Sequence, residues 1–303
     1  MAYRKGIILA GGIGSRLYPV TKTISKQLLP IYDKPMIYYP LSTLMLAGIK
    51  EILIITNPND KDDFVKLLKD GSHLGINIKY ETQKNPNGLA EAFIIGKTFI
   101  KESNVVLILG DNLFHGNDLI SLLQRNYSNN KGASIFVYPV IDPERYGVIE
   151  LDSNGRVIGI EEKPSKPKSK LAITGIYFYD NTVIEKAHQL KPSRRGELEI
   201  SDLNELYLKD GNLIVEKMGR GMTWLDTGTF DSLHEASSFV KSLEKRHGLK
   251  IGCPEEVAWR MKFIDDQQLY CLSKSSLNSN YANYLKSIIN ESNYSIKNVN
   301  SCY

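Results

Sequence analysis

A glycine-rich segment with a nearby arginine follows the first apolar residues of the chain, in LAGGIGSRLYP at residues 9–19. It contains three glycines, Gly11, Gly12 and Gly14. Because glycine has no Cβ, the backbone N–H groups of such a loop can approach a phosphate closely. Arg16 adds a positive charge, and Lys26 in SKQLLP adds a second one further along. The segment therefore predicts a loop that binds the phosphates of a nucleoside triphosphate, with a tight turn and surface cations as the alternative.

Two other phosphate-binding motifs do not fit this segment. In the dinucleotide motif G-x-G-x-x-G the third glycine would fall on Leu17, and Pro19 would break the helix that should begin there. The second apolar strand ends at Thr56 without the acidic ribose ligand of that fold. A Walker loop fits only at residues 96–98, where Glu91 stands in place of the first glycine. A dinucleotide oxidoreductase and a P-loop kinase are therefore both disfavoured.

Two aspartates could hold a metal ion beside such a loop. Asp111 follows the apolar segment VVLILG, and Asp226 lies in WLDTGT. Mg²⁺ keeps several waters and usually takes one or two protein carboxylates together with phosphate oxygens. Either aspartate alone is more often a helix cap or a turn residue, so the prediction depends on the two sharing a site. His115 is the one histidine near these motifs, and we expect it to be structural.

The elements that must position these residues follow from the hydrophobic periodicity. Through the first half, short runs of Val, Ile and Leu alternate with helical patterns, which is typical of a parallel sheet covered on both faces. These strands are predicted at GIILA, EILIIT, INIKY and VVLILG. From Ala133 the strands follow one another closely, with a turn signal at Asn154-Gly155, so antiparallel strands are expected there. After Trp224 the pattern is mostly helical.

These patterns predict an α/β fold with a Rossmann-like, doubly wound mixed sheet, added antiparallel strands and a helical C-terminal part. The expected organisation is a core over residues 1–228, a helical segment over 229–290 and a frayed tail over 291–303. A chain of 303 residues can bury one large core, and no apolar run approaches the roughly 18 residues of a membrane span. The net charge of +4 is too small and too dispersed for nucleic-acid binding. Cys253, Cys271 and Cys302 are expected to be reduced thiols of a cytoplasmic protein.

The order of several short motifs resembles the sugar-1-phosphate nucleotidylyltransferases, over about residues 4–290. Besides the opening segment they are SKQLLPIYDKPMIYYP, QKNPNGLAEA, LGDNLF, ERYGVIE, IEEKP, ITGIYFYD, RGELEISDLN and WLDTGT. The first and the seventh of these narrow the resemblance to the branch of glucose-1-phosphate thymidylyltransferases. The resemblance implies Mg²⁺-dependent transfer of dTMP from dTTP to glucose 1-phosphate in a homotetramer. It also implies a regulatory site for a deoxysugar nucleotide near Arg220 and Cys253.

The resemblance further implies a role for individual residues. Arg16 would neutralise the departing pyrophosphate, Lys26 would hold the phosphates near the reacting α-phosphorus, and Lys163 would bind the sugar phosphate. Asp111 and Asp226 would be the Mg²⁺ ligands. The implied nucleotide-binding residues are Leu9, Gly11, Gly12, Gly14, Gln27, Gln83, Pro86 and Gly88. The implied sugar-binding residues are Asp111, Tyr146, Gly147, Glu162, Lys163, Ile173, Thr174 and Tyr177.

The residue types agree with this chemistry. A sugar phosphate is already an anionic nucleophile and needs no general base, whereas the α-phosphorus and the leaving pyrophosphate need cations that stabilise their charge. Direct in-line attack, with inversion at that phosphorus, is therefore expected. Two alternatives stay open at this point: a uridylyl, cytidylyl or adenylyl transferase with the same fold, and a non-catalytic nucleotide-sugar sensor. Taken alone, Lys163 and Glu162 would be ordinary loop residues, and Tyr146 and Tyr177 ordinary core aromatics.

Overall fold

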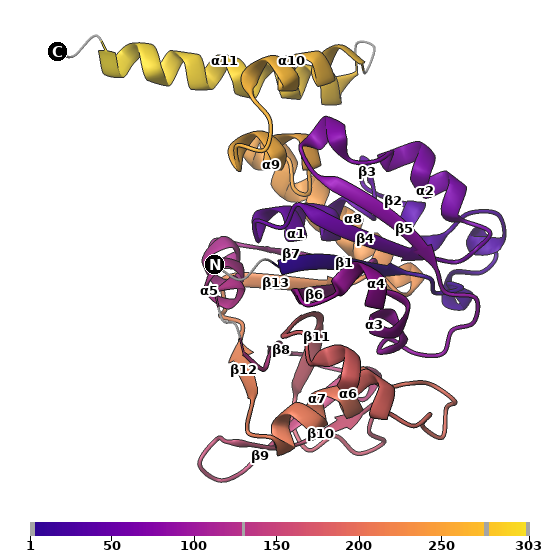
Figure 1. Cartoon of the computed structure of the whole chain (residues 1–303). Helices are drawn as coiled ribbons and strands as arrows, with labels where there is room; N and C mark the ends of the chain where they lie inside the picture. Colours follow the sequence, from indigo (N-terminus) through magenta and orange to yellow (C-terminus); the bar gives the residue numbers. More distant parts are fainter. Residues whose placement is uncertain (1–3, 129–130, 276–278, 301–303) are drawn as a thin grey trace.

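The computed structural model describes residues 4–128, 131–275 and 279–300 of the chain. Its centre is a mixed sheet with a buried apolar core on each face, and helices surround this sheet (Figure 1). Within the described ranges, no helix is both long and apolar enough to cross a membrane. The predicted α/β class with a doubly wound mixed sheet is confirmed.

Four parallel strands form the half of the sheet that comes from the N-terminal part of the chain. In spatial order they are β5 (Asn77–Thr82), β4 (Glu51–Thr56), β1 (Arg4–Ala10) and β6 (Asn104–Leu109). Ile7 and Ile8 are both fully buried, one in each core, because helices cover the two faces. The carboxyl ends of these strands meet at one edge, where ligands bind to open sheets of this kind.

Five further strands extend the sheet, mostly with antiparallel pairing. They are β8 (Ala133–Pro139), β9 (Gly147–Leu151), β10 (Val157–Glu162), β11 (Leu171–Tyr179) and β12 (Leu213–Lys217). Strand β11 runs antiparallel to β6 and so joins the two halves, with Ile176 opposite Ile108. Two small pairs stand apart from this sheet: β7 (Asn112–Gly116) with β13 (Met222–Asp226), and β2 (Pro30–Ile31) with β3 (Lys34–Pro35).

The helices divide between the two faces of the sheet. One core contains side chains of α1 (Tyr38–Leu46), α2 (Lys61–Leu68), α5 (Leu119–Tyr127) and α9 (Pro254–Arg260). The other core contains side chains of α3 (Glu91–Ile95), α4 (Lys97–Ile100), α6 (Val183–Gln189) and α7 (Ile200–Lys209). Gly96 separates α3 from α4, and a Cβ on it would lie 2.9 Å from the carbonyl oxygen of Ala92.

The C-terminal part is helical, as its pattern predicts. It comprises α8 (Phe230–His247), α9, α10 (Asp266–Ser275) and α11 (Asn280–Asn300). Helix α8 begins at an N-terminal capping box between Thr229 and Ser232, directly after β13. Helices α10 and α11 lie side by side beyond α9, at one end of the molecule (Figure 1). Helix α11 continues through Asn300, past the expected start of the tail at residue 291, and residues 301–303 lie outside the described chain.

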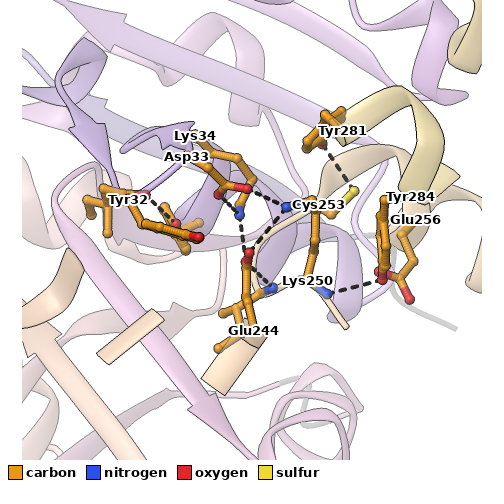
Figure 2. A network of polar contacts seen from close by, with 12 residues as sticks. Tyr32, Asp33, Lys34, Glu244, Lys250, Cys253, Glu256, Tyr281 and Tyr284 are labelled. Carbon is orange, nitrogen blue, oxygen red and sulfur yellow. Dashed lines mark hydrogen bonds and ion pairs between the residues drawn. The ribbon is translucent and has the colours of Figure 1, made fainter. Parts of the chain in front are cut away.

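A partly buried group of charges holds the C-terminal segment against the β2–β3 hairpin (Figure 2). We call it the Glu244 network, and its members are Asp33, Lys34, Glu244 and Lys250. Lys34 Nζ donates to Glu244 Oε1 at 2.7 Å and also to Asp33, while Lys250 Nζ pairs with Glu244 Oε2 at 3.2 Å and also with Asp33. The side chains of Lys34 and Glu244 are 1% and 5% exposed, so the network ties α8 to the hairpin from inside the protein.

Candidate active site

A cavity of about 460 Å³ opens where the parallel and antiparallel halves of the sheet meet. Most residues that were predicted for catalysis and sugar binding line it: Arg16, Asp111, Tyr146, Gly147, Glu162, Lys163, Ile173, Tyr177 and Asp226. A larger hollow, of about 920 Å³, lies along residues 259–268 of the C-terminal helices and contains none of the predicted site residues. The smaller cavity is therefore the candidate active site, because charge and predicted chemistry converge there.

Asp111 lies just past the carboxyl end of β6 and is paired with Lys26. Lys26 Nζ donates to Asp111 Oδ2, and Asn112 Nδ2 donates to Asp111 Oδ1 at 2.9 Å. Burial alone would raise the pKa of the Asp111 carboxyl, but the charge and hydrogen bond of Lys26, together with hydrogen bonds from Asn112 and the backbone, outweigh it, and the pKa is lowered. Asp111 is thus a carboxylate beside a cation, although the two residues lie far apart in the sequence.

Asp226 is brought beside Asp111 by the pairing of β13 with β7. Asp226 lies opposite Asn112 in that register, and the backbone N–H of Thr227 donates to the carbonyl oxygen of Asp111 at 3.1 Å. The backbone N–H of Gly228 donates to Asp226 Oδ1 at 2.8 Å. Burial raises the pKa of Asp226, and the negative charge of Asp111 raises it further, against three nearby cations. The two predicted metal ligands therefore share one site.

The glycine-rich loop follows β1 and turns back over the same edge. Gly14 has φ of +66°, and a Cβ on it would lie 2.9 Å from a methyl carbon of Thr21. The loop then forms a 3₁₀ turn at Ser15–Leu17 instead of the long helix of a dinucleotide fold. The side chain of Arg16 lines the cavity, and its Nη2 lies beside Gly228. Lys26 and Arg16 thus bring two positive charges to the pair of aspartates.

The residues predicted for the nucleotide base lie next to the glycine loop. Gln83 Nε2 donates to the carbonyl oxygen of Gly88 at 3.1 Å and to Glu91 Oε2 at 2.7 Å. A Cβ on Gly11 would lie 2.9 Å from Gln83 Oε1, so this glycine allows the close approach. Gly88 has φ of +106° and packs against the backbone of Leu198.

Three other predicted nucleotide residues surround this group. Gln27 is buried beside Gly110, and its Oε1 accepts a hydrogen bond from Ser25 at 2.8 Å. Leu9 is buried in β1, whereas Pro86 is exposed. A Cβ on Gly12 would meet no atom within 4 Å, which leaves its backbone open to a ligand.

The antiparallel half supplies the opposite wall of the cavity. Glu162 lies opposite Gly147 in the β9–β10 register and accepts a hydrogen bond from Ser201. Burial raises the pKa of Glu162, although Ser201 and two cations act in the other direction. One of these cations is Lys163, whose Nζ lies 3.7 Å from Glu162 Oε1, and Lys163 holds φ of +44°. A backbone strained in this way is often found where a side chain must point in one direction.

Strand β11 carries alternate residues to the cavity. Ile173, Gly175 and Tyr177 line it, and a register shift against β8 occurs between Ile173 and Tyr177. Thr174 was predicted for the sugar-binding wall but is not among the lining residues, because it lies between two of them on a strand. Its Oγ1 is buried without a hydrogen-bond partner.

Several lining residues were not predicted from the sequence. These are Leu89, Leu109, Asn112, Arg145, Gly175, Glu197, Glu199, Ile200, Ser201 and Trp224. Asn112 links the two aspartates to the wall, since it donates to Asp111 and accepts from Trp224 Nε1 at 2.5 Å. Glu197 to Ser201 lie within RGELEISDLN, so the motif itself was a signal that could have placed them.

Other residues of interest lie away from the cavity. His115 does not line it and stacks edge-on against Phe239, with ring centroids 6.0 Å apart. Burial lowers the pKa of this histidine. In the described part of the chain, Cys253 and Cys271 are free thiols, whereas Cys302 lies outside it.

Comparison with known proteins assigns the class. The chain belongs to the nucleotidyl transferase family, whose sequence profile matches residues 5–242. It is 56% identical, over 281 residues, to the glucose-1-phosphate thymidylyltransferase of Neisseria meningitidis, covering 93% of this chain and 98% of that protein. A UDP-glucose pyrophosphorylase solved with UDP-glucose is 27% identical with a TM-score of 0.69, over 80% of this chain and all of the other. A Bacillus anthracis protein solved with a sucrose is 42% identical with a TM-score of 0.72, over 78% and 94% of the two chains.

The chemistry of this family suggests a divalent metal, and the two aspartates suit one. Their buried carboxylates lie close enough for the charge of Asp111 to raise the pKa of Asp226, a repulsion that a divalent cation between them would relieve. Among the described residues no cluster of three or more His, Cys, Asp or Glu could hold a metal. A pair of carboxylates with substrate phosphates is the donor set that Mg²⁺ commonly takes.

Proposed function

We propose that the protein transfers a deoxythymidylyl group from dTTP to α-D-glucose 1-phosphate, giving dTDP-glucose and pyrophosphate. This would be the first step of dTDP-deoxysugar synthesis, as in the formation of dTDP-rhamnose. One observation carries the proposal: Arg16 and Asp111, which are proposed to bind the triphosphate and metal, line the same cavity as Glu162 and Lys163, which are proposed to bind the sugar phosphate. The shared sequence with a glucose-1-phosphate thymidylyltransferase supports the choice of both substrates.

The mechanism we propose is direct attack by the sugar phosphate on the α-phosphorus of dTTP. Arg16 and Lys26 lie on the side of the glycine loop and would stabilise the charge of the triphosphate as pyrophosphate departs. Lys163 would hold the phosphate of the acceptor, and Glu162 would accept hydrogen bonds from sugar hydroxyls. Asp111 and Asp226 would hold Mg²⁺, which when bound would supply positive charge next to the phosphate oxygens.

The carboxylate pair is tested by Asp111→Asn and Asp226→Asn, with Asp62→Asn on the exposed side of α2 as the matched control. We expect pyrophosphate release to be nearly abolished in the first two variants and unchanged in the third. Circular dichroism checks that each variant folds. Near-normal Mg²⁺-dependent rates in either variant would remove that residue from the metal site. Inversion with a chiral α-thiotriphosphate is expected, and retention would replace direct attack by a covalent intermediate.

The nucleotide base is what distinguishes the proposed function from its nearest alternatives, the transferases that use another nucleoside triphosphate. A four-way competition among dTTP, UTP, CTP and ATP, followed by pyrophosphate release, separates a thymidylyl from another nucleotidylyl transferase. A panel of sugar 1-phosphates in the same assay tests glucose as the acceptor. Nucleotide binding without pyrophosphate release for any pair would favour a non-catalytic sensor.

We also propose a cytoplasmic homotetramer with a regulatory site for a deoxysugar nucleotide. Arg220 lines a hollow of about 670 Å³ with Tyr138 and Lys217, and Cys253 is buried at the start of α9. Light scattering of the purified protein would test the tetramer. Titration with dTDP-rhamnose at fixed substrate, in wild type and Arg220→Ala, would test the regulatory site.

A further inference from the structure

Arg145 lies in the candidate active site, but the proposed mechanism gives it no role. It ends the 3₁₀ turn Pro143–Arg145, directly before Tyr146 and the first residue of β9, and its side chain lines the cavity. The side chain is one-third exposed, and its guanidinium lies near Asp226, one member of the carboxylate pair.

The guanidinium is held in place at one nitrogen and along its face. Nη1 donates to Asp142 Oδ2 at 2.6 Å, and the guanidinium lies over the ring of Tyr146 with its carbon 5.3 Å from the ring centroid. These contacts restrain the position of the guanidinium, so that the directions open to its remaining N–H bonds are limited in advance.

The other terminal nitrogen is not satisfied. Nη2 of Arg145 is a buried atom without a hydrogen-bond partner, and its nearest acidic oxygen, Asp226 Oδ2, is 3.5 Å away. A buried donor on a charged group that makes no hydrogen bond is costly, and a phosphate oxygen would remove that cost. In a cavity that is proposed to receive two phosphorylated substrates, such an acceptor would be supplied by the ligand.

We propose that Arg145 is a further catalytic residue, an inference that rests on the proposed function. Its Nη2–H donates to a phosphate oxygen of the reacting groups, on the acceptor phosphate or on the transferred α-phosphoryl group. In the free protein the same nitrogen provides Asp226 with a counter-charge. Arg145 would compete with a divalent cation for Asp226, and with the cation bound there the N–H bonds of Arg145 would be available to the phosphate.

The test uses Arg145→Met, which keeps much of the stem but removes the charge, and Arg145→Lys, which keeps a charge without the planar fork. Arg156→Met, in the exposed turn between β9 and β10, is the matched control. We expect Arg145→Met to lose about 10- to 100-fold in kcat/KM, the range of a charge-assisted hydrogen bond, and Arg145→Lys to lose less. A rise confined to the KM of the sugar phosphate would place the contact on the acceptor. A fall in kcat with both KM values unchanged would place it on the α-phosphoryl group.

A second readout does not depend on turnover. Binding of Mn²⁺ to the full-length protein without substrates, followed by electron paramagnetic resonance, should tighten several-fold in Arg145→Met because the competing cation is gone. Kinetic constants within twofold of wild type in Arg145→Met, or equal Mn²⁺ affinity in the two proteins, would overturn the proposal. If wild type and Arg156→Met release no pyrophosphate, the proposed function itself fails, and the Mn²⁺ comparison still decides whether Arg145 competes for Asp226.

Discussion

Removing the charge of Glu244, which does not line the cavity, should strongly destabilise the protein. Glu244 Oε1 accepts from Lys34 at 2.7 Å and from the backbone N–H of Ile251 at 2.9 Å, and Oε2 accepts from Lys250 at 3.2 Å. In Glu244→Gln the volume stays the same, but Lys34, whose side chain is 1% exposed, loses one of its two carboxylates. Breaking a buried ion pair costs about 3–5 kcal/mol. Because Asp33 still pairs with both lysines, we expect the lower end, about 3 kcal/mol.

The assay is equilibrium urea unfolding followed by circular dichroism, with the free energy of unfolding extrapolated to water. Glu235→Gln is the matched control, since Glu235 is exposed on the same helix, and a change within about 0.5 kcal/mol is expected there. The double variant Lys34→Met with Glu244→Met should be less destabilised than the sum of its single variants, because neither charge is then left alone. A loss below about 1 kcal/mol in Glu244→Gln, or additive single effects, would refute the argument for a buried ion pair.

Three further predictions follow from the same structure. Burial opposes ionisation of Asp33, but hydrogen bonds from two lysines hold its pKa below the usual 3.8. This carboxylate therefore contributes stability that is fully present above that pH and is lost as the pH falls through the lowered pKa, so Asp33→Asn should flatten the pH dependence of the urea midpoint below about pH 4. Burial raises the pKa of Glu162, so this side chain gains a proton as the pH falls toward that pKa, and the KM for glucose 1-phosphate should then rise several-fold. A ratio of KM values between wild type and Glu162→Gln that does not change with pH would contradict the assignment. In Gly175→Ala the new Cβ would lie 2.4 Å from Oδ1 of Asn112, whose Nδ2 donates to Asp111, so we expect kcat to fall about 100-fold. Gly219→Ala is the control, because nothing lies within 4 Å of its new Cβ, and kcat should change little there.

The central sheet could be predicted from the sequence because its signals are local. The predicted strand EILIIT coincides with β4 and the predicted strand VVLILG overlaps β6, since continuous runs of Val, Ile and Leu need no partner to be recognised. The absence of a long helix after the glycine loop was also predictable, because Leu17 and Pro19 exclude the dinucleotide pattern. Nine residues that line the cavity were implied by the resemblance of short motifs, and the structure brings them together.

The residues that were missed depend on contacts between distant parts of the chain. Strands β7 and β13 pair across more than a hundred residues, and this pairing, which no local pattern encodes, sets Asp226 beside Asp111. Arg145 follows a proline turn and reaches the aspartates only through the folding of β9 onto β11. The short helices α6 and α7 were not predicted either, and Thr174, which was predicted for the sugar-binding wall, is not among the lining residues.

The pairing of β6 with β11 marks the boundary between the two halves of the sheet, and the proposed roles of the residues differ between these halves. The residues that we propose to bind the triphosphate come mostly from the parallel half, whereas those proposed to bind the acceptor come from β9, β10 and β11. Since the halves join through one antiparallel pairing, the acceptor wall can change while the glycine loop and β1 keep their register. We therefore expect that acceptor specificity can be changed by altering one half of the sheet, and this pairing gives protein engineers a natural boundary for grafting a new acceptor wall beside an unchanged nucleotide-binding half.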